Sequence, residues 1–94
     1  MARLLFAPRA LRDLGRLADF LLEQSVADAA ATAPLIGSAL QVLKQHPMIG
    51  RPAEAGLREL MISRGRTGYV ALYRYAPASD IAVVLAIRPQ REKH

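Results

Sequence analysis

The hydrophobic pattern of this chain changes its period near the middle, and that change limits the folds that the chain can adopt. Between residues 8 and 46 the apolar side chains recur at three- and four-residue spacing, which is typical of α-helices that bury one face. Between residues 57 and 87 they follow the two-residue alternation and the short apolar runs of β-strands. Helices followed by strands predict an α+β protein in which the helices cover one face of a sheet.

The first helix is expected over Pro8–Gln24, after a short strand over Ala2–Phe6. Proline is favoured in the first turn of a helix. The apolar residues that follow form one stripe at helical spacing: Leu11, Leu14, Leu17, Ala18, Leu21 and Leu22. The charged residues are expected on the opposite, solvated side: Arg9, Arg12, Asp13, Arg16, Asp19 and Glu23. The segment is therefore predicted to form an amphipathic helix.

The second helix is expected to begin after Ser25 and to end before Pro47. Ser25 precedes Asp28 by three residues, a spacing that is similar to a capping box. Pro34 lies inside the segment and is expected to kink or break the helix near Ala33, because proline cannot donate the helical hydrogen bond. The connection between the two helices is very short, so they are predicted to pack as an antiparallel hairpin.

Three strands are expected in the second half, over Leu57–Ser63, Tyr69–Tyr75 and Ile81–Ile87. The last of them is apolar on both faces, which places it inside the sheet. Short turns over residues 64–68 and 76–80 join the three strands into an antiparallel meander. The predicted fold is α+β with the order β-α-α-β-β-β, a helical hairpin packed on a small, mainly antiparallel sheet.

The composition excludes several kinds of site. The 94 residues, 52% apolar and 22% charged, predict one small folded domain over residues 1–94. The absence of cysteine excludes a disulfide scaffold, a thiol nucleophile and a cysteine-ligated metal, and we expect neither a metal nor a cofactor. The longest uncharged run, Ala29–Leu43, has 15 residues, fewer than the roughly 20 of a membrane-spanning helix. With no secretory signal visible, we expect a cytoplasmic protein with no membrane partner.

The charge of the chain points to an anionic partner. Thirteen Lys and Arg residues against eight Asp and Glu residues give a net charge of +5, and eleven of the thirteen are arginine. Residues 51–94 contain eight basic and four acidic residues, so most of the excess lies in this half. The planar arginine fork binds phosphates and carboxylates in a bidentate manner. The pattern indicates a recognition surface for a nucleic acid or an acidic protein, with a purely solubilising role as the alternative.

Several short motifs occur in order along the chain. They extend from the first helix to the last strand: Ala10-x-x-Asp13-Leu14, Leu43-x-x-x-Pro47-x-x-Gly50-Arg51, Leu57-Arg58-Glu59-Leu60, Tyr69-x-x-Leu72-Tyr73-Arg74 and Val84-Leu85-x-Ile87-Arg88-x-Gln90-Arg91-Glu92. As a set these motifs resemble the ParE/RelE superfamily of toxins from type II toxin–antitoxin systems. Within the superfamily, the Pro-x-x-Gly-Arg loop and the Leu-Arg-Glu-Leu strand resemble the ParE branch most.

The resemblance implies the toxin of a plasmid-stabilisation module, neutralised by a cognate antitoxin. The ParE branch acts on DNA gyrase, and the RelE branch cleaves messenger RNA on the ribosome. We expect a ParE-like gyrase inhibitor that is not an enzyme and that forms a hetero-oligomer with its antitoxin. One alternative is a RelE-like, ribosome-dependent mRNA endoribonuclease, with the ribosome and mRNA as partners. The other is a toxin fold that has lost its activity and serves as a binding module.

Cleavage of RNA at its 2′-hydroxyl needs a base, an acid and cations that stabilise the charged phosphorane. The arginines can supply the cations, but candidates for proton transfer are few. His46 follows the second helix, His94 is terminal, and Tyr73 and Tyr75 lie on an alternating strand face and are interpreted as packing residues. Pro89 occupies the position at which many relatives carry a histidine. No catalytic residue is assigned, and these features favour the gyrase inhibitor or the inactive module.

The surface that binds the antitoxin or the target is predicted on the arginine-rich half of the chain, at Arg58, Arg64, Arg66, Arg74, Arg88 and Arg91. Arg58 and Glu59 are neighbours on a strand, so they point to opposite faces and cannot pair with each other. One of them is therefore expected to meet a buried partner or a ligand, with a structural salt bridge as the alternative. We expect one or two of the six arginines to carry most of the binding energy, because contacts at the rim of an interface contribute little.

Overall fold

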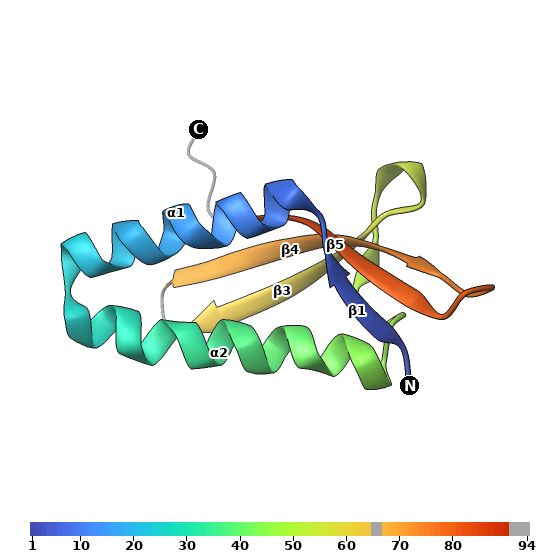
Figure 1. Ribbon diagram of the computed structural model, residues 1–94, viewed down its shortest axis with the longest axis horizontal. Helices are drawn as coiled ribbons and strands as arrows, with labels where there is room; N and C mark the ends of the chain where they lie inside the picture. The colour runs from blue at the N-terminus through green and yellow to red at the C-terminus, as the bar shows by residue number, and fades with distance from the viewer. Residues whose placement is uncertain (65–66, 91–94) are drawn as a thin grey trace.

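A hairpin of two helices covers one face of a five-stranded sheet (Figure 1). The computed structural model describes residues 1–64 and 67–90. The elements are β1 (Arg3–Phe6), α1 (Pro8–Gln24), α2 (Val26–Gln45), β2 (Arg51–Pro52), the 3-10 turn η1 (Glu54–Gly56), β3 (Arg58–Arg64), β4 (Thr67–Ala76) and β5 (Ile81–Pro89). The predicted α+β class and the order of the main elements are confirmed. β2 and η1 are additional elements that the sequence pattern does not predict.

The strands form a mixed sheet in the order β1-β5-β4-β3-β2. β1 runs parallel to β5, with Leu4 opposite Ala82 and Phe6 opposite Val84, and the other neighbours are antiparallel. β5 therefore lies between β1 and β4, as its two apolar faces predict. Because β1 ends opposite Val84, the remainder of β5 has the first half of α1 beside it instead of a strand.

The core lies between the helical hairpin and the sheet. α2 contributes Ile36, Leu40 and Leu43, which recur at helical spacing and are buried. The sheet contributes Tyr73 and Val84, which face each other across β4 and β5 and are fully buried. The core thus joins the two halves of the chain that differ in hydrophobic period.

α2 runs as one helix through Pro34, so the predicted break near Ala33 is wrong (Figure 1). Pro34 lies on the exposed side of the helix, where water can hydrate the carbonyl that loses its partner. The predicted cap is confirmed, because the hydroxyl of Ser25 accepts a hydrogen bond from the Asp28 N–H at 3.2 Å. By length and apolar composition alone this helix could also cross a membrane, although one of its faces packs in the core.

α1 has the predicted bounds, but its buried face differs from the predicted stripe. Leu11 and Leu22, expected toward the core, are 57% and 52% exposed, whereas Asp13, expected in solvent, is only 8% exposed. Asp13 faces the end of β5, where the strand has a backbone N–H that needs an acceptor. A carboxylate satisfies that N–H and a leucine cannot, which explains why an acidic residue occupies the buried face here.

Candidate partner-binding surface

The loop between α2 and β2 is fixed by two side chains of the sheet. Tyr73 donates its hydroxyl hydrogen to the carbonyl of Pro47 and accepts a hydrogen bond from the N–H of Gly50, both at 2.8 Å. Arg58 donates to the carbonyls of Gly50 and Met48 at 2.7 and 3.1 Å. The interpretation of Tyr73 as a packing residue is confirmed, and Arg58 holds the loop. These hydrogen bonds from Tyr73 and Arg58, which we call the loop clamp, hold the loop that precedes β2.

On the other face of the sheet, Glu59 lies between two arginines. Its Oε1 accepts a hydrogen bond from Nε of Arg51 in β2 at 3.0 Å, and its Oε2 lies 3.9 Å from Nη2 of Arg88 in β5. Leu60 packs against the core, so its strand neighbour Glu59 points away from the helices. Two consecutive strands, β2 and β3, and the more distant β5 therefore place these charges together. Arg51 was not among the arginines predicted from the sequence.

This trio can bind a further anion. One carboxylate neutralises only one of the two guanidinium groups, and the arginine side chains are 66% (Arg51) and 49% (Arg88) exposed. A guanidinium carries five N–H donors in a planar fork, so Arg51 and Arg88 retain donors for a phosphate or a carboxylate. The surface thus agrees in chemistry with the anionic partner that the charge of the chain predicts.

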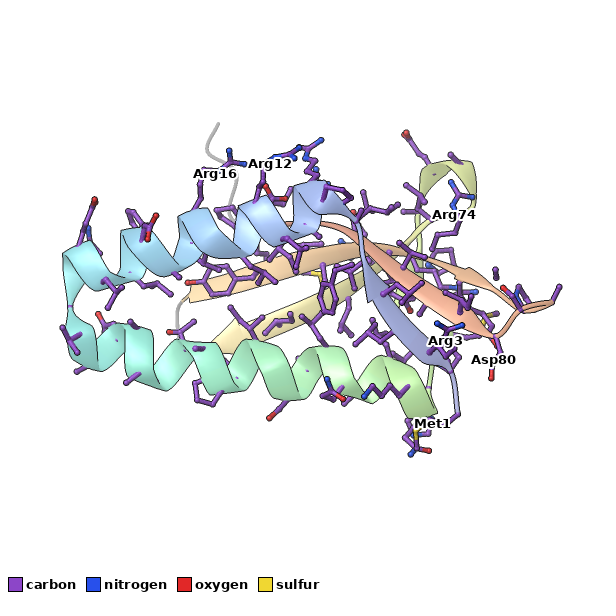
Figure 2. All side chains as sticks on the ribbon, viewed as in Figure 1. Met1, Arg3, Arg12, Arg16, Arg74 and Asp80 are labelled. Carbon is purple, nitrogen blue, oxygen red and sulfur yellow. The ribbon has the colours of Figure 1, made fainter. Side chains whose placement is uncertain are left out.

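The side chains of three predicted arginines are described: Arg58, Arg74 and Arg88. Arg64 ends β3 with only its backbone described, and Arg66 and Arg91 lie outside the described residues. The three described arginines do not form one group. Arg58 is committed to the loop clamp, and Arg88 lies beside Glu59 on the opposite face. Arg74 is exposed and lies beside the η1 turn, far from α1 (Figure 2).

The remaining candidates for proton transfer lie apart from these arginines. The hydroxyl of Tyr75 donates a hydrogen bond to Oδ1 of Asp80 at 2.7 Å in the β4–β5 hairpin. That hydrogen bond to a carboxylate, with some desolvation and the nearby charge, raises the pKa of Tyr75 above its ordinary value of 10.0. His46 ends α2, where its backbone N–H bonds to the carbonyl of Val42, and His94 lies outside the described residues.

Asp13 is a buried charge that the sequence analysis placed in solvent. Its Oδ2 accepts a hydrogen bond from the N–H of Ile87 at 3.0 Å, and its Oδ1 accepts one from Nη2 of Arg16 at 2.7 Å. Nε of Arg9 lies 3.9 Å from Oδ2. A signal for this burial is present in the sequence, because Asp13 lies three residues after the buried Ala10, at the spacing of one helix face.

The chain was compared with known proteins. Residues 4–94 match the family model of the ParE toxin of the type II toxin–antitoxin system, parDE. Toxin RelE3 of Caulobacter vibrioides is 40% identical over 86 residues, which cover 92% of this chain and 91% of that protein. Toxin RelE1 of the same organism is 37% identical over 75 residues, or 80% and 81% of the two chains.

A solved structure shares the fold. A chain of the chromosomal ParDE toxin–antitoxin system from P. aeruginosa superposes with a TM-score of 0.82, and the match covers 97% of this chain and 98% of that one. The two sequences are 23% identical, so this likeness concerns the arrangement of helices and strands.

Proposed function

Because this chain belongs to the ParE toxin family of type II toxin–antitoxin systems, we propose that it arrests growth by binding DNA gyrase, without cutting a substrate. Membership of a toxin–antitoxin module implies a cognate antitoxin that neutralises it. Whether members of the wider ParE/RelE superfamily bind a protein or cut RNA depends on the site rather than on the shared fold.

This proposal rests on the hydrogen bonds that the hydroxyls of Tyr73 and Tyr75 form within the protein. The hydroxyl of Tyr73 is buried and bonds to Pro47 and Gly50, so a substrate could not reach it without opening the loop. The hydroxyl of Tyr75 donates its hydrogen to Asp80, and this hydrogen bond raises the pKa of a phenol that is already protonated at neutral pH, which makes it a poor proton donor to a substrate. Of the described residues considered for proton transfer in the sequence, only His46 remains, and it lies at the end of α2. A basic surface without these acid–base groups suits binding better than catalysis.

Expression from a tightly controlled promoter tests the proposal. We expect growth arrest, a fall in DNA synthesis with broken DNA, and continued protein synthesis in pulse-labelled cells. The purified protein should inhibit supercoiling by purified gyrase. An immediate, selective halt of protein synthesis with cut messages contradicts gyrase as the target. Unchanged growth at good soluble yield contradicts any active toxin and leaves the inactive binding module.

A second candidate function rests on Glu59. A carboxylate between Arg51 and Arg88 combines a group that can take a proton with cations that can stabilise a phosphorane. Two relatives are also named RelE toxins. On this hypothesis the chain is a ribosome-dependent mRNA endoribonuclease. Glu59 would accept the 2′-hydroxyl proton, the 2′-oxygen would attack the adjacent phosphorus, and the bond from phosphorus to the 5′-oxygen would break. The 5′-oxygen would leave as a hydroxyl after taking a proton from water, and protonated Glu59 would return its proton to solvent.

The substitution Glu59→Gln separates the two candidates. Glutamine keeps the size and an oxygen acceptor for Arg51 but cannot act as the base. A nuclease should lose message cleavage by about 10²-fold or more, whereas a gyrase inhibitor should still arrest growth. Glu54→Gln in the η1 turn is the matched control, because it removes an exposed carboxylate away from the trio.

A further inference from the structure

A pocket of about 380 Å³ opens between α1 and the end of β5, on the side of the molecule away from α2. Its size is within the roughly 300–1,000 Å³ of ligand pockets. Leu17 and Phe20 of α1 form one wall, and Tyr69 and Ile87 of the sheet form the other. Phe20 lines the pocket and is 55% exposed to solvent. A ligand that filled the pocket would remove this ring from water.

Three arginines line this pocket, and two of them, Arg9 and Arg16, share the carboxylate of Asp13, whereas Arg88 lies 3.9 Å from Glu59. Asp13 lines the pocket, and its two oxygens already accept hydrogen bonds from Arg16 and from the N–H of Ile87. Nε of Arg9 lies 3.9 Å from Oδ2 of Asp13, which is an ion pair but not a hydrogen bond. The side chains of Arg9 and Arg16 are both mostly exposed. The carboxylate of Asp13 neutralises only one of the guanidinium groups of Arg9 and Arg16, so this rim of the pocket has a net positive charge. The two guanidinium groups also have N–H donors available for a ligand. Figure 2 shows Arg16 and Arg12 projecting from α1 on the side away from α2.

We propose that this pocket receives a large apolar side chain from an acidic segment of the antitoxin, and that carboxylates of the same segment bind Arg9 and Arg16. The inference rests on the antitoxin that the proposed function includes, and it assigns that partner to one place on the toxin. An apolar cavity beside paired arginines is the arrangement of an interface anchor, in which an aliphatic or aromatic group is desolvated and charged groups surround it.

The chemistry of the pocket favours a peptide over a nucleic acid. A phosphate backbone would bring repeated charges to the rim but would leave the apolar walls formed by Leu17 and Phe20 unfilled. A peptide can present an apolar side chain next to a glutamate or an aspartate. The side chain would displace water from Phe20 and Leu17 while the carboxylate meets the arginine fork.

Titration of purified antitoxin against single variants tests the pocket. Phe20→Ala and Arg9→Ala remove the exposed wall and the least-paired cation. Leu22→Ala and Arg12→Ala are matched controls, because both residues are exposed on the same helix and neither lines the pocket. We expect Phe20→Ala and Arg9→Ala each to raise the Kd by about tenfold or more, and the controls to change it by less than about threefold. Circular dichroism and urea unfolding should be unchanged in all four variants.

The outcomes separate this inference from the proposed function. An equal rise of the Kd in all four variants, or an unchanged Kd for Phe20→Ala and Arg9→Ala, would contradict the proposal that the antitoxin binds this pocket. A fluorescent single-stranded oligonucleotide that bound the wild type and lost binding in Arg9→Ala and Phe20→Ala would assign the pocket to nucleic acid and also overturn it. The binding assay does not depend on growth arrest, so an inactive toxin would leave this test intact. In cells, the two pocket variants should still arrest growth but should escape neutralisation.

Discussion

Asp13 shows how much one buried carboxylate can hold in place in a small protein. Its two oxygens accept hydrogen bonds from a strand N–H and from an arginine of its own helix, so it links α1 to β5 and orients Arg16. Its carboxylate is more than nine-tenths buried, and such charges persist in proteins only when they have partners.

We expect Asp13→Ala to lower the free energy of unfolding by about 1–3 kcal/mol, because it leaves the N–H of Ile87 buried without an acceptor. Asp13→Asn should cost less, since its amide oxygen can still accept that bond. Urea unfolding measures both. Asp19→Ala, an exposed acid on the same helix, should stay within about 0.5 kcal/mol of the wild type. Equal effects at the two positions would show that Asp13 does not join the helix to the strand.

Tyr75 and Asp80 should make the fold sensitive to alkaline pH. The hydrogen bond to the Asp80 carboxylate raises the pKa of Tyr75 above 10.0, so folding favours the protonated phenol. The resulting stability is fully present below the ordinary pKa of tyrosine and is lost as the pH rises through the higher pKa of the folded state. Absorbance titration of tyrosinate should show one late step that disappears in Tyr75→Phe. In Asp80→Asn the step should move back toward 10.0; an unmoved step would contradict the assignment.

Glycines differ in role from one element to the next. Gly15 and Gly37 lie inside α1 and α2, and a Cβ added to either would meet nothing within 4 Å. Gly50 lies in the loop before β2, where an added Cβ would lie 2.7 Å from the hydroxyl oxygen of Tyr73 and 2.8 Å from the carbonyl oxygen of Glu59. The helices therefore tolerate a side chain, and the loop clamp does not.

Alanine substitutions at these glycines should consequently change the free energy of unfolding in opposite directions. Gly15→Ala and Gly37→Ala should each raise the free energy of unfolding by about 0.5–1 kcal/mol, because alanine restricts the unfolded chain and favours the helix. Gly50→Ala should lower it by about 1–3 kcal/mol, since the clamp must shift to admit the methyl group. Thermal or urea unfolding measures all three. A neutral Gly50→Ala would mean that Tyr73 does not fix the loop.

At the scale of the whole molecule, the net charge of +5 should determine the rate at which an acidic antitoxin associates with the protein. Long-range attraction raises association rates, and salt screens it over a Debye length of about 10 Å at 0.1 M. We expect the association rate to fall by about tenfold between about 50 and 500 mM NaCl. The dissociation rate should change much less, because apolar contacts resist screening. Stopped-flow mixing measures both rates, and a salt-independent association rate would argue against an acidic partner.

The sequence by itself determined the two helices, the four longer strands and their order, but not β2 and η1. The period of the apolar residues gave the two helices, and for α1 it gave both ends, Pro8 and Gln24. The two apolar faces of β5 placed that strand inside the sheet. These features are local, because the type of an element is encoded in apolar spacings of two to four residues. The resemblance to the toxin superfamily likewise depends on short motifs in order.

Only the tertiary structure decided which charges meet. Asp13 and Ile87 bond across 74 positions, and Glu59 joins strands from three parts of the chain. The pocket beside Phe20 exists only because β1 stops short and α1 takes its place next to β5. The spacing of apolar residues predicts which face of an element packs in the core. It does not predict which atoms of other elements lie opposite a given residue. That second fact depends on the register and the packing of elements that are distant in the sequence, and it determines where an anion or a partner can bind.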